Sequence, residues 1–266
     1  MIDILCNERC SKCNHWKFDS QKKVDSIRTI TDFVNQIETI DEFIIVGGEP
    51  LIYRREIIEI ISNISKKIRV TVITNGVLAD RKFIDSIKSK NTHLIFSIDT
   101  LDKQFWKFVR GKDTFDIVMK NFEYARLNLD PIQLSVQSVL SKETADHVNN
   151  VSRWLEPLGI YHSIQDYISE GFDGNWTEIV QKRVKISEPC IAHKYNMSIM
   201  PNGDVYTCFQ QNQINECMSP VGNVKINTFS EIIESKYLQF VIEKMKKCSL
   251  PCKVLKCNIE GNEIIA

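Results

Sequence analysis

Near its start the chain reads Cys6-Asn7-Glu8-Arg9-Cys10-Ser11-Lys12-Cys13, and this stretch decides the fold. Three cysteines stand at C-x3-C-x2-C spacing after a short apolar run at residues 2–5, which predicts a loop leaving a first strand. Thiolates are the ligands that iron-sulfur clusters and zinc select. A four-iron cluster normally takes four thiolates, so three from one loop would leave one iron open for a substrate or cofactor. Zinc sites favour paired C-x2-C spacing, and a zinc site or three unrelated cysteines stay open as alternatives.

Composition limits the classes of protein that fit this chain. Its 266 residues suffice for one large domain with a small appendage. Lys+Arg and Asp+Glu balance at 34 each, so we expect no nucleic-acid partner. No secretion signal follows Met1 and no apolar run reaches about 18 residues, so we expect a cytoplasmic protein that does not bind a membrane. The nine cysteines cluster at the two ends, with none between Cys13 and Cys190, which indicates metal or cluster binding in a reduced compartment.

Strand and helix patterns alternate over the first two thirds of the chain. We expect strands at residues 2–5, 42–46, 69–73, 93–98, 132–139 and 160–165. We expect helices at residues 26–39, 54–67, 80–89, 114–129 and 143–155. This alternation predicts a parallel sheet with right-handed crossovers, which is either open or curled into a barrel.

Unusual loops follow four of the expected strands. The cysteine loop follows the first strand, Gly47-Gly48-Glu49-Pro50 the second, Thr74-Asn75-Gly76 the third, and Asp99 the fourth. In parallel α/β folds the functional site lies at the carboxyl ends of the strands. We therefore expect these loops to meet at one edge of the sheet.

The cysteine triplet, the Gly-Gly-Glu-Pro loop and the strand order around them resemble the radical S-adenosylmethionine (SAM) enzymes over roughly residues 1–165. The resemblance implies a partial (β/α)6 TIM-like barrel in which Cys6, Cys10 and Cys13 hold a [4Fe-4S] cluster. SAM would bind the open iron of that cluster through its amino and carboxylate groups. A fourth protein ligand would block SAM, so a loop with only three cysteines leaves the open iron that SAM needs.

The resemblance also implies which residues bind SAM. They are Gly47, Gly48, Glu49, Pro50, Thr74, Asn75, Ser97 and Asp99. Glycines let the backbone approach the methionine part without a Cβ in the way. A glutamate offers a charge-assisted hydrogen bond to an ammonium group. The strand-four pair would help to hold the ribose or the methionine moiety.

Lys12 departs from the family pattern, because the residue before the third cysteine is usually aromatic and packs near the adenine. Trp16 and His15 are the candidates to supply that surface, although each suits a structural role equally well or better. Five further polar residues lie at or near strand ends and are as suited to structural as to catalytic roles. They are Arg110, Gln137, His162, Gln165 and Asp166.

The last hundred residues resemble the Twitch form of the SPASM extension of radical SAM enzymes. Cys190, a hairpin with its turn at Asn202-Gly203, and a Gly-x4-Cys that ends at Cys208 match its first half. Cys248, Cys252 and Cys257 match the second half more loosely, and Cys217 is expected to be a spare thiol. We expect one auxiliary [4Fe-4S] cluster on Cys190, Cys208 and two of the last three, with zinc as the alternative.

The expected organisation is a radical SAM core at residues 1–166, a connection at 167–189 and a small α+β Twitch/SPASM-like extension with a β-hairpin at 190–266. The resemblance implies cleavage of SAM to a 5′-deoxyadenosyl radical, which takes a hydrogen atom from the substrate. A single auxiliary cluster resembles the layout of an aminocyclitol dehydrogenase, which predicts dehydrogenation of a small sugar-like or aminocyclitol substrate. Flavodoxin or ferredoxin would supply electrons.

Two other functions remain open. One is maturation of a ribosomally made peptide by cross-linking, epimerisation or oxidation, although the motif begins at Cys6 and leaves no room for the N-terminal peptide-binding extension of many such enzymes. The other is a structural iron-sulfur or zinc protein, which would not need the Gly-Gly-Glu-Pro loop.

Overall fold

The computed structural model describes residues 1–13, 15–17, 26–167, 190, 192–208, 211, 214 and 216–247. Contacts divide the chain into two compact units. The sheet unit comprises residues 2–21 and 38–179, and the C-terminal unit comprises Met1, residues 22–37 and residues 180–266. Apart from Tyr167, the expected connection at 167–189 lies outside the described residues.

The sheet unit is built on one parallel sheet whose strands follow chain order. The strands are β1 (Glu42–Ile45), β2 (Arg69–Thr74), β3 (Thr92–Ser97), β4 (Leu134–Leu140) and β5 (Tyr161–Asp166). Each strand pairs with the next in parallel, so every connection is a crossover. Within the described residues the order begins at β1 and ends at β5, so the sheet does not close. The expected parallel α/β class is confirmed.

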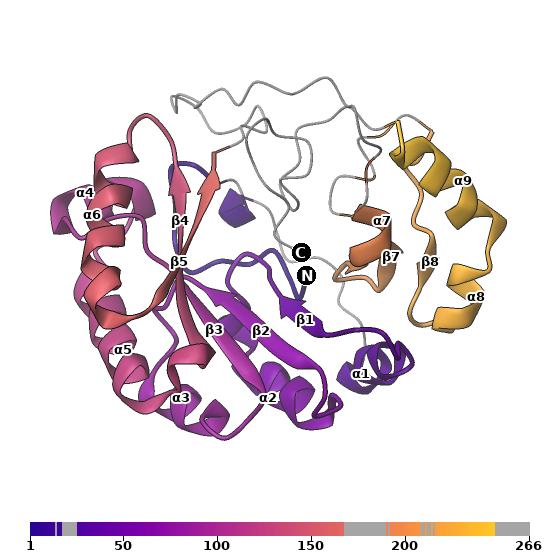
Figure 1. Ribbon diagram of the computed structural model, residues 1–266, viewed down its shortest axis with the longest axis horizontal. Helices are drawn as coiled ribbons and strands as arrows, with labels where there is room; N and C mark the ends of the chain where they lie inside the picture. The colour runs from indigo at the N-terminus through magenta and orange to yellow at the C-terminus, as the bar shows by residue number, and fades with distance from the viewer. Residues whose placement is uncertain are drawn as a thin grey trace. The chain divides into compact units, whose positions relative to one another are not determined.

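Helices connect these strands and follow one another along the outer side of the sheet (Figure 1). They are η2 (Pro50–Tyr53), α2 (Arg54–Asn63), α3 (Arg81–Ile87), α4 (Lys103–Arg110), α5 (Phe115–Asn128), η3 (Pro131–Gln133), α6 (Ala145–Leu155) and η4 (Glu156–Leu158). The 3-10 turn η1 (His15–Lys17) precedes β1 in the chain. Helix α4 was not predicted from the sequence. Its ends are marked by Asp102, whose side chain accepts a hydrogen bond from the Phe105 N–H, and by Gly111, which adopts the left-handed conformation after the last turn.

The core of the sheet unit lies between the sheet and these helices. Along β3 the side chains of Leu94 and Phe96 are buried, while the alternate residues of the strand are partly exposed on the other face. Phe96 packs edge to face against Phe122 of α5, with ring centroids 5.5 Å apart. Along β3 the sheet therefore buries one face under helices and leaves the other face partly exposed.

The expected first strand at residues 2–5 is wrong. This segment forms no ladder with β1 but runs along the loop after it, where the Ile2 N–H donates to Val46 O (2.8 Å) and the Glu49 N–H donates to Leu5 O (2.7 Å). Its backbone hydrogen bonds are thus satisfied by the Gly-Gly-Glu-Pro loop instead of a strand. The sheet has five described strands, not the six that we expected.

The C-terminal unit combines a small antiparallel sheet with short helices. The elements are α1 (Ile27–Asn35), α7 (Ala192–Tyr195), β6 (Ser198–Ile199), β7 (Asp204–Tyr206), β8 (Gly222–Asn223), α8 (Phe229–Ile233) and α9 (Lys236–Met245). The sheet order is β6-β7-β8, and Ser198 pairs with Tyr206. The expected hairpin is confirmed, whereas β8 and α7 were missed because each is only two to four residues long.

Helix α1 belongs to this unit although its sequence precedes the sheet. Phe33 is buried in the unit's apolar core with Val205, Val241 and Met245. The Phe33 ring also meets Phe229 edge to face at 6.2 Å. The unit therefore takes part of its core from a segment far away in the chain. Among the helices that the structure describes, none has the length and apolar content that a membrane crossing needs.

Candidate functional site

The cysteine loop is held against the end of helix α4 by backbone hydrogen bonds. The Arg9 N–H donates to Arg110 O, and the Ser11 N–H donates to Val109 O, both at 3.0 Å. Carbonyls in the last turn of a helix lack partners within the helix, so this loop satisfies two of them. Gly111 makes the contact possible, because a Cβ at its position would lie 2.3 Å from Arg9 O.

The three cysteines of this loop, Cys6, Cys10 and Cys13, are partly exposed. Burial raises the pKa of Cys6 to about 12, and the neighbouring Cys10, Glu49 and Cys13 add to this effect, although a hydrogen bond from the Glu8 N–H opposes it. The thiolate form of Cys6 therefore needs a positive partner, which iron supplies.

The thiols fit a cluster better than a single ion. Among the described residues, no three His, Cys, Asp or Glu side chains are placed to hold one metal ion. A four-iron cluster binds each thiolate to a different iron, so its ligands do not have to converge on one point. The donor set of three thiols on one loop is compatible with the expected cluster.

The two glycines of the Gly-Gly-Glu-Pro loop are required by the chain itself. A Cβ on Gly47 would lie 2.4 Å from Asp3 O, and one on Gly48 would lie 2.2 Å from Ile4 O. The segment before the cysteines therefore packs directly on this pair. We expected the glycines to make room for a cofactor, and the structure adds this second reason for them.

Glu49 is buried and joins two loops at the carboxyl end of the sheet. Its carboxylate accepts hydrogen bonds from the Thr74 hydroxyl (2.7 Å), the Asn75 N–H (2.8 Å) and the Leu51 N–H (3.0 Å). Burial raises the pKa of Glu49 to about 6, against the opposing effect of these three donors. Pro50 is buried at the first position of η2, for which Glu49 is the N-cap. In this arrangement Glu49 braces the protein's own loops.

Asn75 links the end of β2 to the cysteine loop. Its side-chain amide donates to Asn7 Oδ1 at 2.7 Å and lies 4.0 Å from Cys6 Sγ. The expected meeting of the cysteine loop with the loops after the second and third expected strands is thus seen at the level of single atoms.

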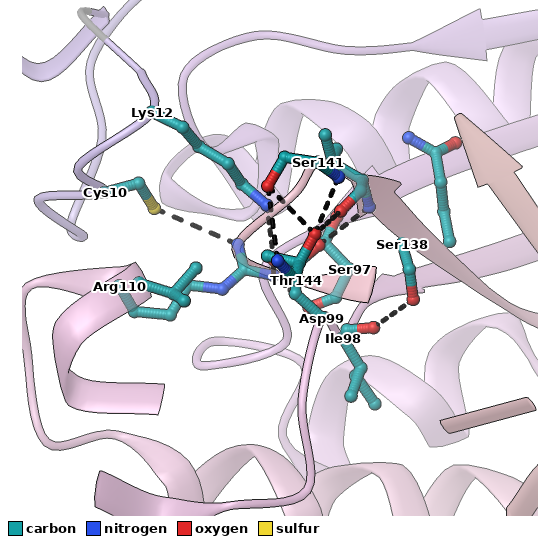
Figure 2. Close-up of polar contacts among 12 residues, drawn as sticks. Cys10, Lys12, Ser97, Ile98, Asp99, Arg110, Ser138, Ser141 and Thr144 are labelled. Atoms are coloured by element: carbon teal, nitrogen blue, oxygen red, sulfur yellow. Dashed lines mark hydrogen bonds and ion pairs between the residues drawn. The ribbon is translucent and has the colours of Figure 1, made fainter. Parts of the chain in front are cut away.

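A buried group of three charged residues lies beneath Cys10; we call Lys12, Asp99 and Arg110 the charged trio. Lys12 Nζ and Arg110 Nη2 lie 2.8 and 2.9 Å from the same oxygen, Asp99 Oδ2. Figure 2 shows both cationic side chains converging on Asp99, with the Arg110 guanidinium turned toward Cys10. Arg110 Nη1 lies 3.9 Å from Cys10 Sγ.

Backbone groups complete the trio. Arg110 Nη2 also donates to Ser97 O at 2.6 Å, and the Val139 N–H donates to Asp99 Oδ1 at 2.8 Å. Burial would raise the pKa of Asp99, but Lys12 and Arg110 together hold it below its ordinary value. Burial lowers the pKa of Lys12. Ser97 and Asp99, which we expected near SAM, are therefore engaged by the chain's own cations.

Lys12, the departure from the family pattern, thus has a defined place: its side chain is 9% exposed and paired with Asp99. Trp16 donates from Nε1 to Cys10 O at 3.1 Å, and Arg9 lies over its ring. Trp16 therefore supports the cysteine loop from its own side. The sequence analysis missed the trio, because nothing in a single sequence pairs positions so far apart.

The remaining polar candidates divide between the two faces of the sheet. His162 contacts Ser138 Oγ (2.7 Å) and Ser152 Oγ of α6 (2.8 Å), so it packs toward the helices. Gln137 and Gln165 join side chains across β4 and β5, with the Gln137 amide donating at 3.3 Å. They alternate with His162 and Ser138, which places them on the opposite face, where both are partly exposed. Asp166 ends β5.

In the C-terminal unit, Cys190 and Cys217 are buried in the apolar core and Cys208 is partly buried beside it. Burial raises the pKa of Cys217, as expected for an inert thiol. The buried Gln211 side chain donates to Cys217 O (3.1 Å) and accepts from the Thr207 N–H (2.8 Å), which closes the loop after Cys208. Cys248, Cys252 and Cys257 lie outside the described residues.

Comparisons with known families agree with this geometry. Residues 5–155, more than half of the chain, match the radical SAM superfamily. Residues 190–258 match SPASM, an iron-sulfur cluster-binding domain. These matches imply a [4Fe-4S] cluster that binds SAM and an auxiliary cluster, and they leave the zinc and non-catalytic alternatives without support.

Two curated relatives share part of their length with the chain. GTP 3',8-cyclase of Alkaliphilus oremlandii is 29% identical over 147 residues, which cover 52% of this chain and 46% of the relative. The radical SAM cyclopropyl synthase TigE of Paramaledivibacter caminithermalis is 27% identical over 173 residues, covering 56% of this chain and 36% of the relative. The chain thus spans less than half the length of these relatives.

A solved structure extends the likeness over both units. Streptococcus suis SuiB bound to S-adenosylmethionine superposes with a TM-score of 0.70 at 16% identity, covering 89% of this chain and 64% of SuiB. At this identity the likeness concerns the fold.

Proposed function

The chain belongs to the radical SAM superfamily, and on this premise we propose that it modifies a peptide substrate by abstracting a hydrogen atom. Cys6, Cys10 and Cys13 would hold the cluster that binds SAM. With SAM bound, that cluster supplies the 5′-deoxyadenosyl radical that takes the hydrogen atom. The observation that carries the proposal is the set of three thiols on one loop, braced by Asn75 at the carboxyl end of the sheet.

The chain's own residues would hold this site rigid. The Gly47–Gly48 backbone, the Glu49 carboxylate and the Thr74–Asn75 turn fix the cysteine loop from one side. The end of α4 fixes it from the other side. Gly47, Gly48, Pro50, Thr74, Asn75, Ser97 and Asp99 remain our candidates to contact SAM. Glu49 would act by positioning that loop as well as by its charge.

A peptide substrate is supported by two solved structures of similar fold. SuiB has been solved with its precursor peptide SuiA at a TM-score of 0.68 to this chain, and anSMEcpe with the Kp18Cys peptide at a TM-score of 0.67. The face of the sheet opposite the helices carries side-chain amides at Gln137 and Gln165. Such amides both donate and accept, which suits peptide N–H and C=O groups.

The auxiliary cluster would accept the electron that the substrate radical loses in an oxidative reaction. We propose Cys190, Cys208 and two of Cys248, Cys252 and Cys257 as its ligands, and Cys217 as a spare thiol. Flavodoxin or ferredoxin is the proposed electron donor. Cys10→Ala should abolish SAM cleavage, whereas Cys208→Ala should spare cleavage and stop product formation.

The test begins with anaerobic reconstitution of the full chain. About eight irons per chain are expected from two four-iron clusters, and SAM with a reductant should release 5′-deoxyadenosine. Synthetic copies of short peptides encoded beside the gene then serve as substrates. A mass change in one of them, absent with Cys10→Ala, supports the proposal. Release of 5′-deoxyadenosine with no peptide altered, but with a sugar oxidised, contradicts it.

A small-molecule substrate is the second candidate. The relatives named GTP 3',8-cyclase favour it, since their name specifies a nucleotide. Dehydrogenation of a sugar or aminocyclitol stays a prediction, because neither curated relative described above carries such a name. A panel of aminocyclitols, sugars and GTP, scored by mass for loss of two hydrogens and by chromatographic separation for a cyclised isomer, separates this candidate from the first.

A further inference from the structure

The charged trio has a geometry that points at one cysteine. Asp99 Oδ2 and Ser97 O both bind Arg110 Nη2, at 2.9 and 2.6 Å. With one nitrogen fixed in this way, the planar guanidinium directs its other terminal nitrogen, Nη1, to 3.9 Å from Cys10 Sγ. The Trp106 ring lies 5.2 Å from the guanidinium carbon and supports this orientation.

Lys12 is the second cation of the trio and stands where the family usually has an aromatic side chain. Its Nζ lies 2.8 Å from Asp99 Oδ2, the oxygen that Arg110 shares. The Lys12, Asp99 and Arg110 side chains are 9%, 3% and 7% exposed, so water screens their charges only weakly. Both cations interact electrostatically with Cys10.

We propose that Lys12, acting with Arg110 and Asp99, raises the reduction potential of the cluster that Cys6, Cys10 and Cys13 hold. Reduction adds a negative charge to the cluster, and a fixed positive charge beside a ligand sulfur stabilises that reduced form. Lys12 is thus a positioning residue: it acts through its charge and through Asp99. The inference rests on the assignment of these three cysteines as cluster ligands, but it does not depend on which substrate the enzyme takes.

Each buried charge near the cluster shifts its reduction potential in a direction given by the sign of that charge. Glu8 is also buried in the cysteine loop, where its carboxylate accepts from the Thr114 hydroxyl at 2.7 Å, and burial raises its pKa. Because Glu8 is unchanged in the variants below, it shifts all potentials alike. Removing the positive charge of Lys12 should lower the potential, and removing the negative charge of Asp99 should raise it.

The experiment compares midpoint potentials in the reconstituted full chain without substrate. A dye-mediated redox titration is followed by electron paramagnetic resonance on the signal that changes when SAM is added, which separates this cluster from the auxiliary one. The variants are Lys12→Met, Lys12→Arg and Asp99→Asn. Lys12→Gln is a second neutral variant that keeps a donor for Asp99, in case the methionine variant binds little iron. Lys17→Met removes an equal charge from an exposed residue nearby.

We expect the potential to become more negative in Lys12→Met and Lys12→Gln and less negative in Asp99→Asn. Lys12→Arg and Lys17→Met should keep the wild-type value. Equal potentials in wild type and both neutral Lys12 variants overturn the inference. Shifts of the same sign at Lys12 and Asp99 also overturn it, because they would mean a general loosening of the loop. A wild-type protein without a SAM-responsive signal would overturn the ligand assignment itself.

Discussion

Glu49 connects two loops of the chain through one carboxylate. One of its oxygens serves both the Leu51 N–H and the Thr74 hydroxyl, and the other serves the Asn75 N–H. All of these donors lie at the carboxyl end of the sheet, next to the cysteine loop. The Glu49 carboxylate therefore serves largely to hold the loops of the site together.

Glu49→Gln should lower the free energy of unfolding by about 1–3 kcal/mol. The amide replaces one acceptor oxygen by NH2, so a buried N–H that now donates to the carboxylate would face another donor. Urea unfolding of the apo-protein measures the change. Glu59→Gln, on the exposed side of α2, is the matched control and should stay within about 0.5 kcal/mol of wild type. Equal unfolding midpoints for the two variants would contradict this role of Glu49.

Helix α4 ends where the cysteine loop needs partners. Its last carbonyls accept from the loop backbone, and Gly111 follows at φ +68° with Arg9 O pressed against it. Because the end of α4 positions the cysteine loop, a substitution at its cap, Gly111, should displace the cysteines.

Gly111→Ala should therefore displace the cysteine loop and remove most of the SAM-responsive cluster signal. Gly159→Ala is the matched control, since Gly159 also has a positive φ of +64° but a Cβ there meets nothing within 4 Å. It should cost about 1–2 kcal/mol of backbone strain and keep its iron. Iron and sulfide per chain, with the paramagnetic signal, measure both variants. Full cluster content in Gly111→Ala would show that the loop adapts without the helix end.

Periodicity made the elements of the sheet unit predictable, because a pattern of 2 or 3.6 residues is a local property. Four of the six expected strands match observed ones to within one residue at each end, and β4 begins two residues later than expected, after the 3-10 turn η3. Residues 2–5 misled us, since a short apolar run fits a strand as well as any buried extended segment. Helix α4 was missed although Asp102 and Gly111 mark its ends.

The candidate site was predictable where a motif carries it and not where long-range pairing makes it. The cysteine spacing predicted the cysteine loop, and the Gly-Gly-Glu-Pro motif predicted the loop that packs beside it. The contact of Lys12 with Asp99 joins positions 87 residues apart. The fold brings them together, and no local sequence pattern predicts the pair. The identity of a charged residue says nothing of which opposite charge it will meet.

The molecule consists of two units that differ in the size of the apolar core that stabilises them. The sheet unit has a large core under the five α-helices α2 to α6, whereas the C-terminal unit has strands of two or three residues and a small core. Small domains of this kind commonly depend on bound metal for their stability.

Loss of the auxiliary cluster should therefore loosen the C-terminal unit and leave the sheet unit intact. Cys208→Ala should speed amide hydrogen exchange in α8 and α9, while exchange in β2 and β3 stays as in wild type. Cys10→Ala removes a ligand of the other cluster and should leave α8 and α9 unchanged. Hydrogen exchange with mass spectrometry resolves these segments. Unchanged protection of α8 and α9 in Cys208→Ala would show that their core is sufficient without the cluster.

The place of α1 in the C-terminal unit has a consequence for biosynthesis. Phe33 leaves the ribosome early, but its core partners begin only at Cys190. At roughly 5–20 residues per second, the helix waits about 8–30 s for them. During that time the sheet can form while an aromatic side chain of α1 stays without its native neighbours, so nascent chains are exposed to premature association at this helix. A factor that shields α1 during translation should raise the yield of folded protein more than one that acts after release.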